Sequence, residues 1–328
     1  MLGKMVKTAV LRSVLLGFSC AVLAAPVGAK DIESAKIIVG YAPGATIDIM
    51  TRLIAEKMRV SLNRTITVEN RTGAGGVIAN EAVKMSPADG TVLLVAPITT
   101  MVVYPHSYSN LKYNPFTDFV PVATISRFHY VFGTSTQVPA KTMAEFTTLL
   151  KQDPKKYALF SSAGAGSPSH FFGMLLGQSA GVTMTHVAYR GSAPILQAIM
   201  ANEIPAAFLT LSDLGNLARS GKANLLAVAG ANRSPSFPNV PTLKELGIDV
   251  EGYGTYGLYA PAKTPPDVVK AYEGALIAAV NSPDVKQKFE QMVLEPAGAP
   301  GAELATQMKT EYAYWEKIIK ASGFKQDK

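Results

Sequence analysis

Short apolar segments rich in β-branched residues alternate with segments of helical periodicity along most of this 328-residue chain. The first ones are a strand at 36–41, a helix at 47–60, a strand at 65–69, a helix ending at residue 84 and a strand at 91–96. Consecutive β-α-β units join parallel strands and leave helices on the faces of the sheet. The alternation therefore predicts an α/β fold with parallel strands.

The same alternation returns further along the chain. Strands are predicted at 157–162, 183–188 and 225–229, with helices that begin at Pro168 and Pro194. After residue 255 the pattern becomes helical. Thr264 is predicted to be the N-cap of the first of these helices, with a proline at the first helical position. The last helix carries an apolar stripe made by Leu304, Met308, Tyr312, Trp315 and Ile319.

The length of the chain suggests one large or two medium domains. No low-complexity tract, internal repeat or long linker separates the two patterned regions. Two domains without such a linker indicate that the chain crosses between them more than once. We therefore predict one lobe from 30–128 together with 255–328, and a second lobe inserted at 129–254.

Residues 1–29 have the pattern of a secretory signal: a basic start, a short apolar segment and small residues before a cleavage site near Ala29. Cys20 would be acylated in a lipoprotein, but Gly17 stands where an aliphatic residue is expected. The apolar segment is shorter than the ~20 residues that span a bilayer. Cleavage lowers the formal net charge from +7 to +4 by removing Lys4, Lys7 and Arg12, and it removes the single cysteine. An exported, soluble, cysteine-free protein is predicted.

Motifs of catalysis and of cofactor binding are incomplete in this sequence. Ser167 is flanked by Ala165 and Ser169 where a nucleophile elbow needs glycines, and the glycine-rich run 73–76 is not completed as a dinucleotide fingerprint. The four histidines show no metal-binding spacing, and the basic residues are scattered. We expect no cofactor, no metal and no nucleic-acid partner.

Three predicted strand-to-helix junctions carry loops of small and polar residues, at 41–48, 161–170 and 189–194. A helix N-terminus has unpaired N–H groups and a partial positive charge, so it favours an anion. In a parallel sheet such junctions lie at the carboxyl ends of the strands, where ligands bind. Each loop alone is better explained by ordinary turn chemistry, which any α/β protein has at such junctions. Together they predict a site that holds a carboxylate without catalysis.

A series of motifs follows in order along the chain: Ile38–Asp48, Val68–Gly76, Pro87–Thr91, Asn114–Ala123, Ser161–His170, Tyr189–Pro194, Arg233–Thr242 and Tyr256–Pro261. In these motifs the sequence resembles the tripartite tricarboxylate transporter receptors, the Bug-type periplasmic solute-binding proteins. The motifs cover nearly the whole chain after the predicted signal. The resemblance implies a two-lobed periplasmic-binding-protein-like fold of type II, in which crossover strands join lobes built on mostly parallel sheets with flanking helices.

The resemblance also implies how such a protein works. The lobes close over a small carboxylated ligand, with dicarboxylates and aromatic carboxylates as candidate classes, and a membrane permease receives it. A monomer in the periplasm is expected. Matched by motif, the ligand-binding residues are Tyr41, Pro43, Gly44, Ala45, Thr46, Asp48, Ser162, Ala163, Gly164, Ser167, His170, Tyr189, Arg190 and Leu209.

Some positions depart from the family pattern. Ala45 replaces a common glycine, Ile47 a common threonine, and Thr255 a common tryptophan. Leu209 and Pro205 stand where acidic residues are usual. If Leu209 lines the cleft, the acid that could pair with a ligand ammonium is absent. This predicts a carboxylic acid without an amino group.

Two other functions remain open at this stage. A periplasmic sensor could bind the same ligand and signal to a membrane kinase instead of a permease. A periplasmic enzyme acting on a carboxylate could use Ser167 and His170, which lie within the first turn of one predicted helix.

Overall fold

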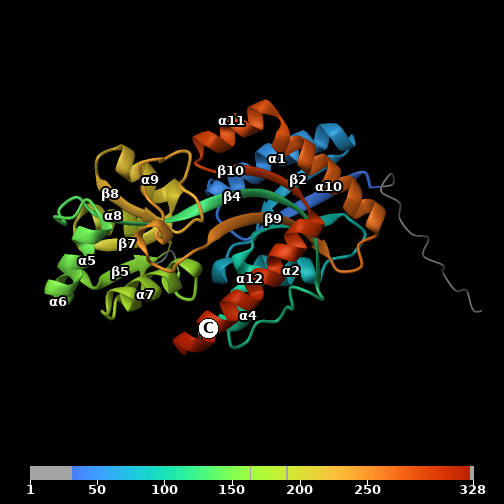
Figure 1. The fold of residues 1–328 in the computed structure, drawn as a ribbon. Helices are drawn as coiled ribbons and strands as arrows, with labels where there is room; N and C mark the ends of the chain where they lie inside the picture. The colour runs from blue at the N-terminus through green and yellow to red at the C-terminus, as the bar shows by residue number, and fades with distance from the viewer. Residues whose placement is uncertain (1–31, 163, 190, 326–328) are drawn as a thin grey trace, which may run out of the picture.

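The computed structural model describes residues 32–162, 164–189 and 191–325. The predicted two-lobed α/β fold is confirmed (Figure 1). In the first lobe, β1 pairs in parallel with β2 and β3. The elements of this region are β1 (Ser34–Val39), α1 (Thr46–Leu62), β2 (Thr65–Asn70), α2 (Val77–Lys84), β3 (Val92–Pro97), α3 (Thr99–Val102) and α4 (Tyr104–Ser107), with a 3-10 turn at Ala74–Gly76.

The second lobe repeats this plan, because β5 pairs in parallel with β6 and β7. Its elements are α5 (Met143–Gln152), α6 (Pro154–Tyr157), β5 (Leu159–Ser162), α7 (Pro168–Ala180), β6 (Thr185–Ala188), α8 (Ser192–Met200), β7 (Ala206–Thr210), α9 (Leu211–Arg219) and β8 (Ala223–Val228), followed by a 3-10 turn at Lys244–Leu246. The segment predicted as a strand at 157–162 thus begins with the end of α6, and its strand starts at Leu159.

Two long strands run from one lobe into the other (Figure 1). The first part of β4 (Phe119–Ser135) pairs antiparallel with β9 (Tyr253–Pro261), and its last part, from Tyr130, pairs with β7 and β8. The partner changes between His129 and Tyr130. The sheet is therefore mixed: the β-α-β units supply the parallel pairs, and the crossover strands add antiparallel ones.

The C-terminal part of the chain packs on the first lobe. It contains α10 (Pro266–Asn281), α11 (Pro283–Gln291), β10 (Glu295–Pro300), which pairs with β4, and α12 (Gly301–Ser322). The N-cap of α10 is Pro265, so the prediction of Thr264 was wrong by one residue. The reason is that the Thr264 hydroxyl donates to Pro261 O instead of facing the helix.

Helix α12 reaches beyond its own lobe. Its Leu304 and Met308 are buried in the main hydrophobic core. Near its end, the Trp315 ring lies 5.4 Å from the ring of Phe172 on α7, centroid to centroid. The predicted apolar stripe therefore bridges the two lobes. Within the described part of the chain, no helix is both long and apolar enough to cross a bilayer.

Candidate functional site

The carboxyl ends of the parallel strands in the two lobes face each other across the crossover strands. In the first lobe, β3 ends at Pro97, which pairs with Tyr256, and Tyr256 in turn pairs with Ser126 of β4. In the second lobe, β7 ends at Thr210, which pairs with Tyr130 of β4. Ser126 and Tyr130 are four residues apart, or about 13 Å along an extended strand. The junction loops predicted from the sequence therefore border one region between the lobes.

The loop between β1 and α1 is fixed by the carboxylate of Asp48, which is 2% exposed. Its Oδ2 accepts the backbone N–H of Gly44 at 2.9 Å, and its Oδ1 accepts Arg52 Nε at 3.0 Å and Asn70 Nδ2 at 2.8 Å. Burial alone would raise the pKa of Asp48, but the hydrogen bonds from Arg52, Gly44 and Asn70 outweigh it and hold the pKa below its ordinary value. The Asp48 side chain thus fixes the β1–α1 loop by accepting the Gly44 N–H.

The helices that follow parallel strands differ in how their N-termini are capped. Ala45, Gly76 and Gly191 stand at the N-caps of α1, α2 and α8, and none of these residue types has a side-chain oxygen. By contrast, α7 and α9 are capped by Ser167 and Thr210, whose hydroxyls accept backbone N–H groups of the first turn. The N-termini of α1 and α8 therefore have no side-chain acceptor at the N-cap for their first-turn N–H groups, whereas Val77 at the start of α2 already donates to Ala74 O.

Tyrosine side chains gather beside these termini. The Tyr41 hydroxyl donates to Gly75 O at 3.0 Å, and the rings of Tyr104 and Tyr108 lie 4.7 Å apart. Burial raises the pKa of Tyr41, with added effects from Tyr130 and Tyr108, and burial likewise raises the pKa of Tyr256. The hydroxyls are therefore neutral hydrogen-bonding groups at any ordinary pH. Tyr256 also packs its ring against Phe128 at 4.7 Å.

The loop between β5 and α7 is held by its own side chains. Ser167 Oγ donates to Gly164 O at 2.6 Å, and Ser162 Oγ lies 2.8 Å from His186 Nε2. His170 Nδ1 accepts the Gly166 N–H at 3.0 Å, so the neutral imidazole carries its proton on Nε2. Burial and the neighbouring His186 ring lower the pKa of His170 to about 4. The Ser167 hydroxyl is directed to a backbone carbonyl and not to the His170 imidazole.

The predicted ligand-binding residues of the β1–α1 loop and of the end of β6 differ in how exposed they are. Pro43 and Gly44 are exposed on the β1–α1 loop, with Ala45 and Thr46 half-buried beside them, and Tyr189 is half-buried after β6. Ala163 and Arg190 lie outside the described residues. Among the described residues, no three His, Cys, Asp or Glu side chains are grouped so that they could hold a metal ion.

Leu209 requires a correction. It was expected to line the cleft, but its side chain is fully buried in a hydrophobic cluster with Val131 and Leu214. Alternation along β7 turns position 209 into the core of the second lobe. An acid, Asp213, lies in the first turn of the following helix α9. Burial raises the pKa of Tyr256, and the neighbouring tyrosines and Asp213 raise it further. Because the Leu209 side chain is buried in the core, its apolar character does not exclude an amino group on the ligand.

Tyr130, Tyr256 and Asp213 were not among the residues predicted from the sequence, and the structure brings them close to one another beside Tyr41. Their approach depends on the register of β4 against β7 and β9, which no local pattern reveals. One available signal was the alternation in the motif Tyr253–Pro261, which places residues 254, 256 and 258 on one face of a strand.

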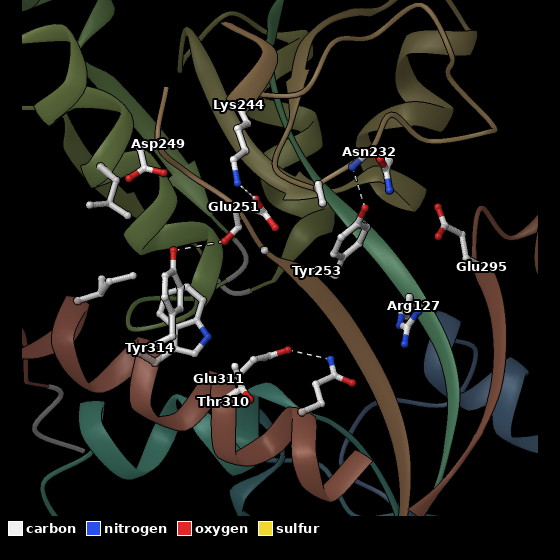
Figure 2. A pocket seen from close by; sticks show the side chains of 16 residues that line it. Arg127, Asn232, Lys244, Asp249, Glu251, Tyr253, Glu295, Thr310, Glu311 and Tyr314 are labelled. Atoms are coloured by element: carbon white, nitrogen blue, oxygen red, sulfur yellow. Dashed lines mark hydrogen bonds and ion pairs between the residues drawn. The ribbon is translucent and has the colours of Figure 1, made fainter. Parts of the chain in front are cut away.

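A cavity of about 880 Å³ lies elsewhere, between α12 and the second lobe (Figure 2). Its walls include Arg127 of β4, Tyr253 of β9 and Glu311 of α12. Gln307 of α12 donates to Thr255 Oγ1, so Tyr253 and Thr255 face α12, while Tyr256 faces the tyrosine cluster. The residues that line this cavity include none from the junction loops at 41–48, 161–170 and 189–194.

Comparison with known proteins agrees with this geometry. The sequence profile described as tripartite tricarboxylate transporter family receptor matches residues 50–324. A UPF0065 protein from the tcbD-tcbE intergenic region of Pseudomonas sp. strain P51 is 28% identical over 316 residues, which cover 94% of this chain and 93% of that protein.

Two solved structures from Rhodopseudomonas palustris are also similar. One, with adipate, has a TM-score of 0.81 at 27% identity and covers 88% of this chain and 97% of its own. The other, MatC with bound malate, has a TM-score of 0.77 at 27% identity and covers 87% of this chain and 98% of its own. From its sequence, its two-lobed fold and these matches, the chain belongs to the tripartite tricarboxylate transporter receptor family, whose members are periplasmic solute-binding proteins.

Proposed function

We propose that this protein binds a small carboxylate between its lobes in the periplasm and delivers it to the membrane permease of a tripartite transporter. The observation that carries the proposal is the uncapped N-terminus of α1, with Ala45 at the N-cap and the preceding loop fixed by Asp48. Open N–H groups and the helix dipole there form a preorganised anion site. A binding role is favoured over catalysis because Ser167 and His170 are not paired through their side chains.

We propose a dicarboxylate as the ligand class. Helices α1 and α8 begin in different lobes, and each has an N-cap residue without a side-chain oxygen. One carboxylate at each N-terminus would satisfy both sets of N–H groups. Adipate and malate, the ligands of the two R. palustris structures, both carry two carboxylates. The tyrosine cluster near β4 and β9 supplies neutral donors and apolar ring surface between the two ends.

Closure of the lobes would follow from the crossover strands. We propose that the lobe boundaries lie at 128/129 and 254/255, next to His129 and Tyr253, which pair in β4 and β9. A ligand that contacts both lobes binds the closed arrangement more tightly than the open one, and only such differential affinity shifts the equilibrium. A permease could then distinguish the loaded protein from the empty one by its shape.

The deciding experiment is a thermal-shift and calorimetric screen of the purified mature protein. The panel contains adipate, malate, a tricarboxylate, benzoate and an amino acid. We expect a dicarboxylate to raise the melting temperature in a concentration-dependent way, since a ligand at 100 times its Kd stabilises by about 2.7 kcal/mol. The ligand should be recovered chemically unchanged after incubation. Conversion of the ligand, or a response to none of the carboxylates, would overturn the proposal.

A further inference from the structure

The cavity beside α12 is separate from the proposed carboxylate site. Its walls come mainly from α12, α7 and the segment around the start of β9, and they include no residue of the β1–α1 loop and none of Tyr41, Tyr130 and Tyr256. Its volume of about 880 Å³ falls within the range of small-molecule sites in proteins. Nothing in the proposed transport cycle uses it.

Both lobes contribute walls to this cavity (Figure 2). The first lobe supplies Arg127, Glu295 and the inner face of α12. The second lobe supplies Leu175 of α7 and the segment that leads into β9, which includes Asp249 and Glu251. An occupant would therefore contact residues on both sides of the crossover strands.

The electrostatic character of one end of the cavity is acidic. Burial raises the pKa of Tyr314, and three carboxylates that interact with its hydroxyl, those of Asp249, Glu251 and Glu311, raise it further. Figure 2 shows Asp249 and Glu251 on one side of the cavity and Glu311 on the other, where the Glu311 carboxylate accepts a hydrogen bond from Gln307 at 2.8 Å. Lys244 forms an ion pair with Glu251 at 2.6 Å, so the net negative charge of this end comes from Asp249 and Glu311. Arg127 lies at the other end of the cavity, where β4 pairs with Glu295.

Aromatic and apolar side chains complete this end. Trp315 and Tyr253 line the wall beside Glu311, and Leu175 and Ile318 extend it toward the space between α7 and the end of α12. Carboxylates beside tryptophan and tyrosine rings are the surroundings in which proteins hold organic cations, because the ring faces and the carboxylates attract the same charge. We propose that this cavity is a second binding site, for a small organic amine whose ammonium group lies between Glu311 and the Asp249–Glu251 segment.

Binding of an amine in this cavity should be coupled to the release of a proton. Burial raises the pKa of Glu311 to about 7, against the smaller lowering effects of Gln307 and Arg127. Asp249 and Glu251 face the same space from the second lobe, and Glu311 also interacts with Tyr130 and Tyr259 from the crossover strands. An ammonium group selects the ionised carboxylate. Amine binding near neutral pH must therefore release a proton from Glu311.

The test is isothermal titration calorimetry of the mature protein with 2-phenylethylamine and with its neutral isostere 2-phenylethanol. We expect saturable binding of the amine only. Its affinity should rise about tenfold between pH 6 and pH 8, because the ionised fraction of a group with a pKa near 7 rises by that factor while an alkyl amine stays protonated. Neither probe has a carboxylate, so the result does not depend on the site between α1 and α8.

Two variants complete the experiment. Glu311→Gln keeps the hydrogen-bonding shape but not the charge, and it should weaken amine binding about tenfold or more and abolish its pH dependence. Glu303→Gln removes an exposed carboxylate from the same helix and should leave the affinity unchanged. Thermal unfolding confirms that both variants are folded. Equal binding of amine and alcohol, no saturable binding of the amine, or an affinity indifferent to Glu311→Gln would overturn the proposal.

Discussion

Asn70 donates from its side-chain amide to Asp48 Oδ1 at 2.8 Å, and this bond fastens the end of β2 to the first turn of α1. The same amide donates to Tyr41 O at 2.9 Å. The Asp48 carboxylate also receives the Gly44 N–H from the loop itself. The shape of the β1–α1 loop therefore depends on one buried carboxylate and one amide.

Asp48→Ala should destabilise the fold and weaken carboxylate binding together. The substitution leaves the Gly44 N–H and the Asn70 amide without their acceptor, and we expect a loss of about 2–3 kcal/mol in the free energy of unfolding. Urea unfolding and calorimetry with adipate measure the two effects. Glu56→Ala on the exposed face of α1 is the control and should change stability by at most about 0.5 kcal/mol. If Asp48→Ala behaved like this control, the loop would be held by other contacts.

Ala45→Ser should increase the stability of the fold and decrease the affinity for a carboxylate. Ala45 has φ −65° and ψ 155°, the extended conformation of an N-cap residue, so a serine there can cap α1. We expect about 0.5–1 kcal/mol of added stability from the new hydrogen bond. The hydroxyl would occupy N–H groups proposed for the ligand, so carboxylate affinity should fall.

Ala42→Ser places the same hydroxyl at an exposed position in the same loop and serves as the control. Ala42→Ser should change neither the stability of the fold nor the affinity for a carboxylate. Unchanged or increased adipate affinity in Ala45→Ser would show that the N-terminus of α1 does not bind the carboxylate.

The sequence could predict the elements built from local patterns. The strand ending at Val39, its Pro-Gly loop and the amphipathic helix from Thr46 carry an apolar run, turn residues and a 3.6-residue period in the expected order. The long strand β4 has no such pattern, because Pro121 interrupts it and polar residues such as Arg127 lie within it. The strand β10, with the sequence EPAGAP, contains the residue types that usually exclude strands.

The candidate site likewise has a part that local sequence patterns predict and a part that depends on long-range strand pairing. Its loops were predictable because helix N-termini have local residue preferences. The approach of Tyr130 and Tyr256 was not, since it arises from the pairing of strands more than a hundred residues apart in the chain. The burial of Leu209 follows from the register of β7 on β4, where it pairs with Val131, and this too is non-local.

Arg190→Ala tests the proposed role of the one cationic side chain among the predicted ligand-binding residues. By sequence, Arg190 follows the β6 strand and precedes the N-terminus of α8. A hydrogen bond to a charged group contributes about 1.5–3 kcal/mol, so its loss should weaken adipate binding by that amount. Calorimetry of the variant measures this effect. Arg233→Ala removes an exposed arginine that pairs with Glu245 in the same lobe, and it should leave binding intact. Full affinity in Arg190→Ala would exclude the side chain from the site.

His170 should make the stability of the protein depend on pH. Its folded pKa of about 4 lies below the ordinary value of 6.5, so the unfolded chain binds more protons between these values. Stability is then complete above pH 6.5 and falls as the pH is lowered toward 4. Between pH 7.5 and pH 5 we expect this residue to account for a loss of about 2 kcal/mol.

His170→Asn isolates this contribution, because asparagine can still accept the Gly166 N–H but does not titrate. Urea unfolding of wild type and variant at pH 7.5 and pH 5 gives the comparison. The variant should lose about 2 kcal/mol less than wild type over this interval. Asp48 does not contribute to this difference. Its pKa is lowered in the folded state, so its stabilising effect is lost only at a pH below the ordinary carboxyl range. Equal losses in the two proteins would mean that the His170 imidazole accepts a proton in the folded state as readily as in the unfolded chain.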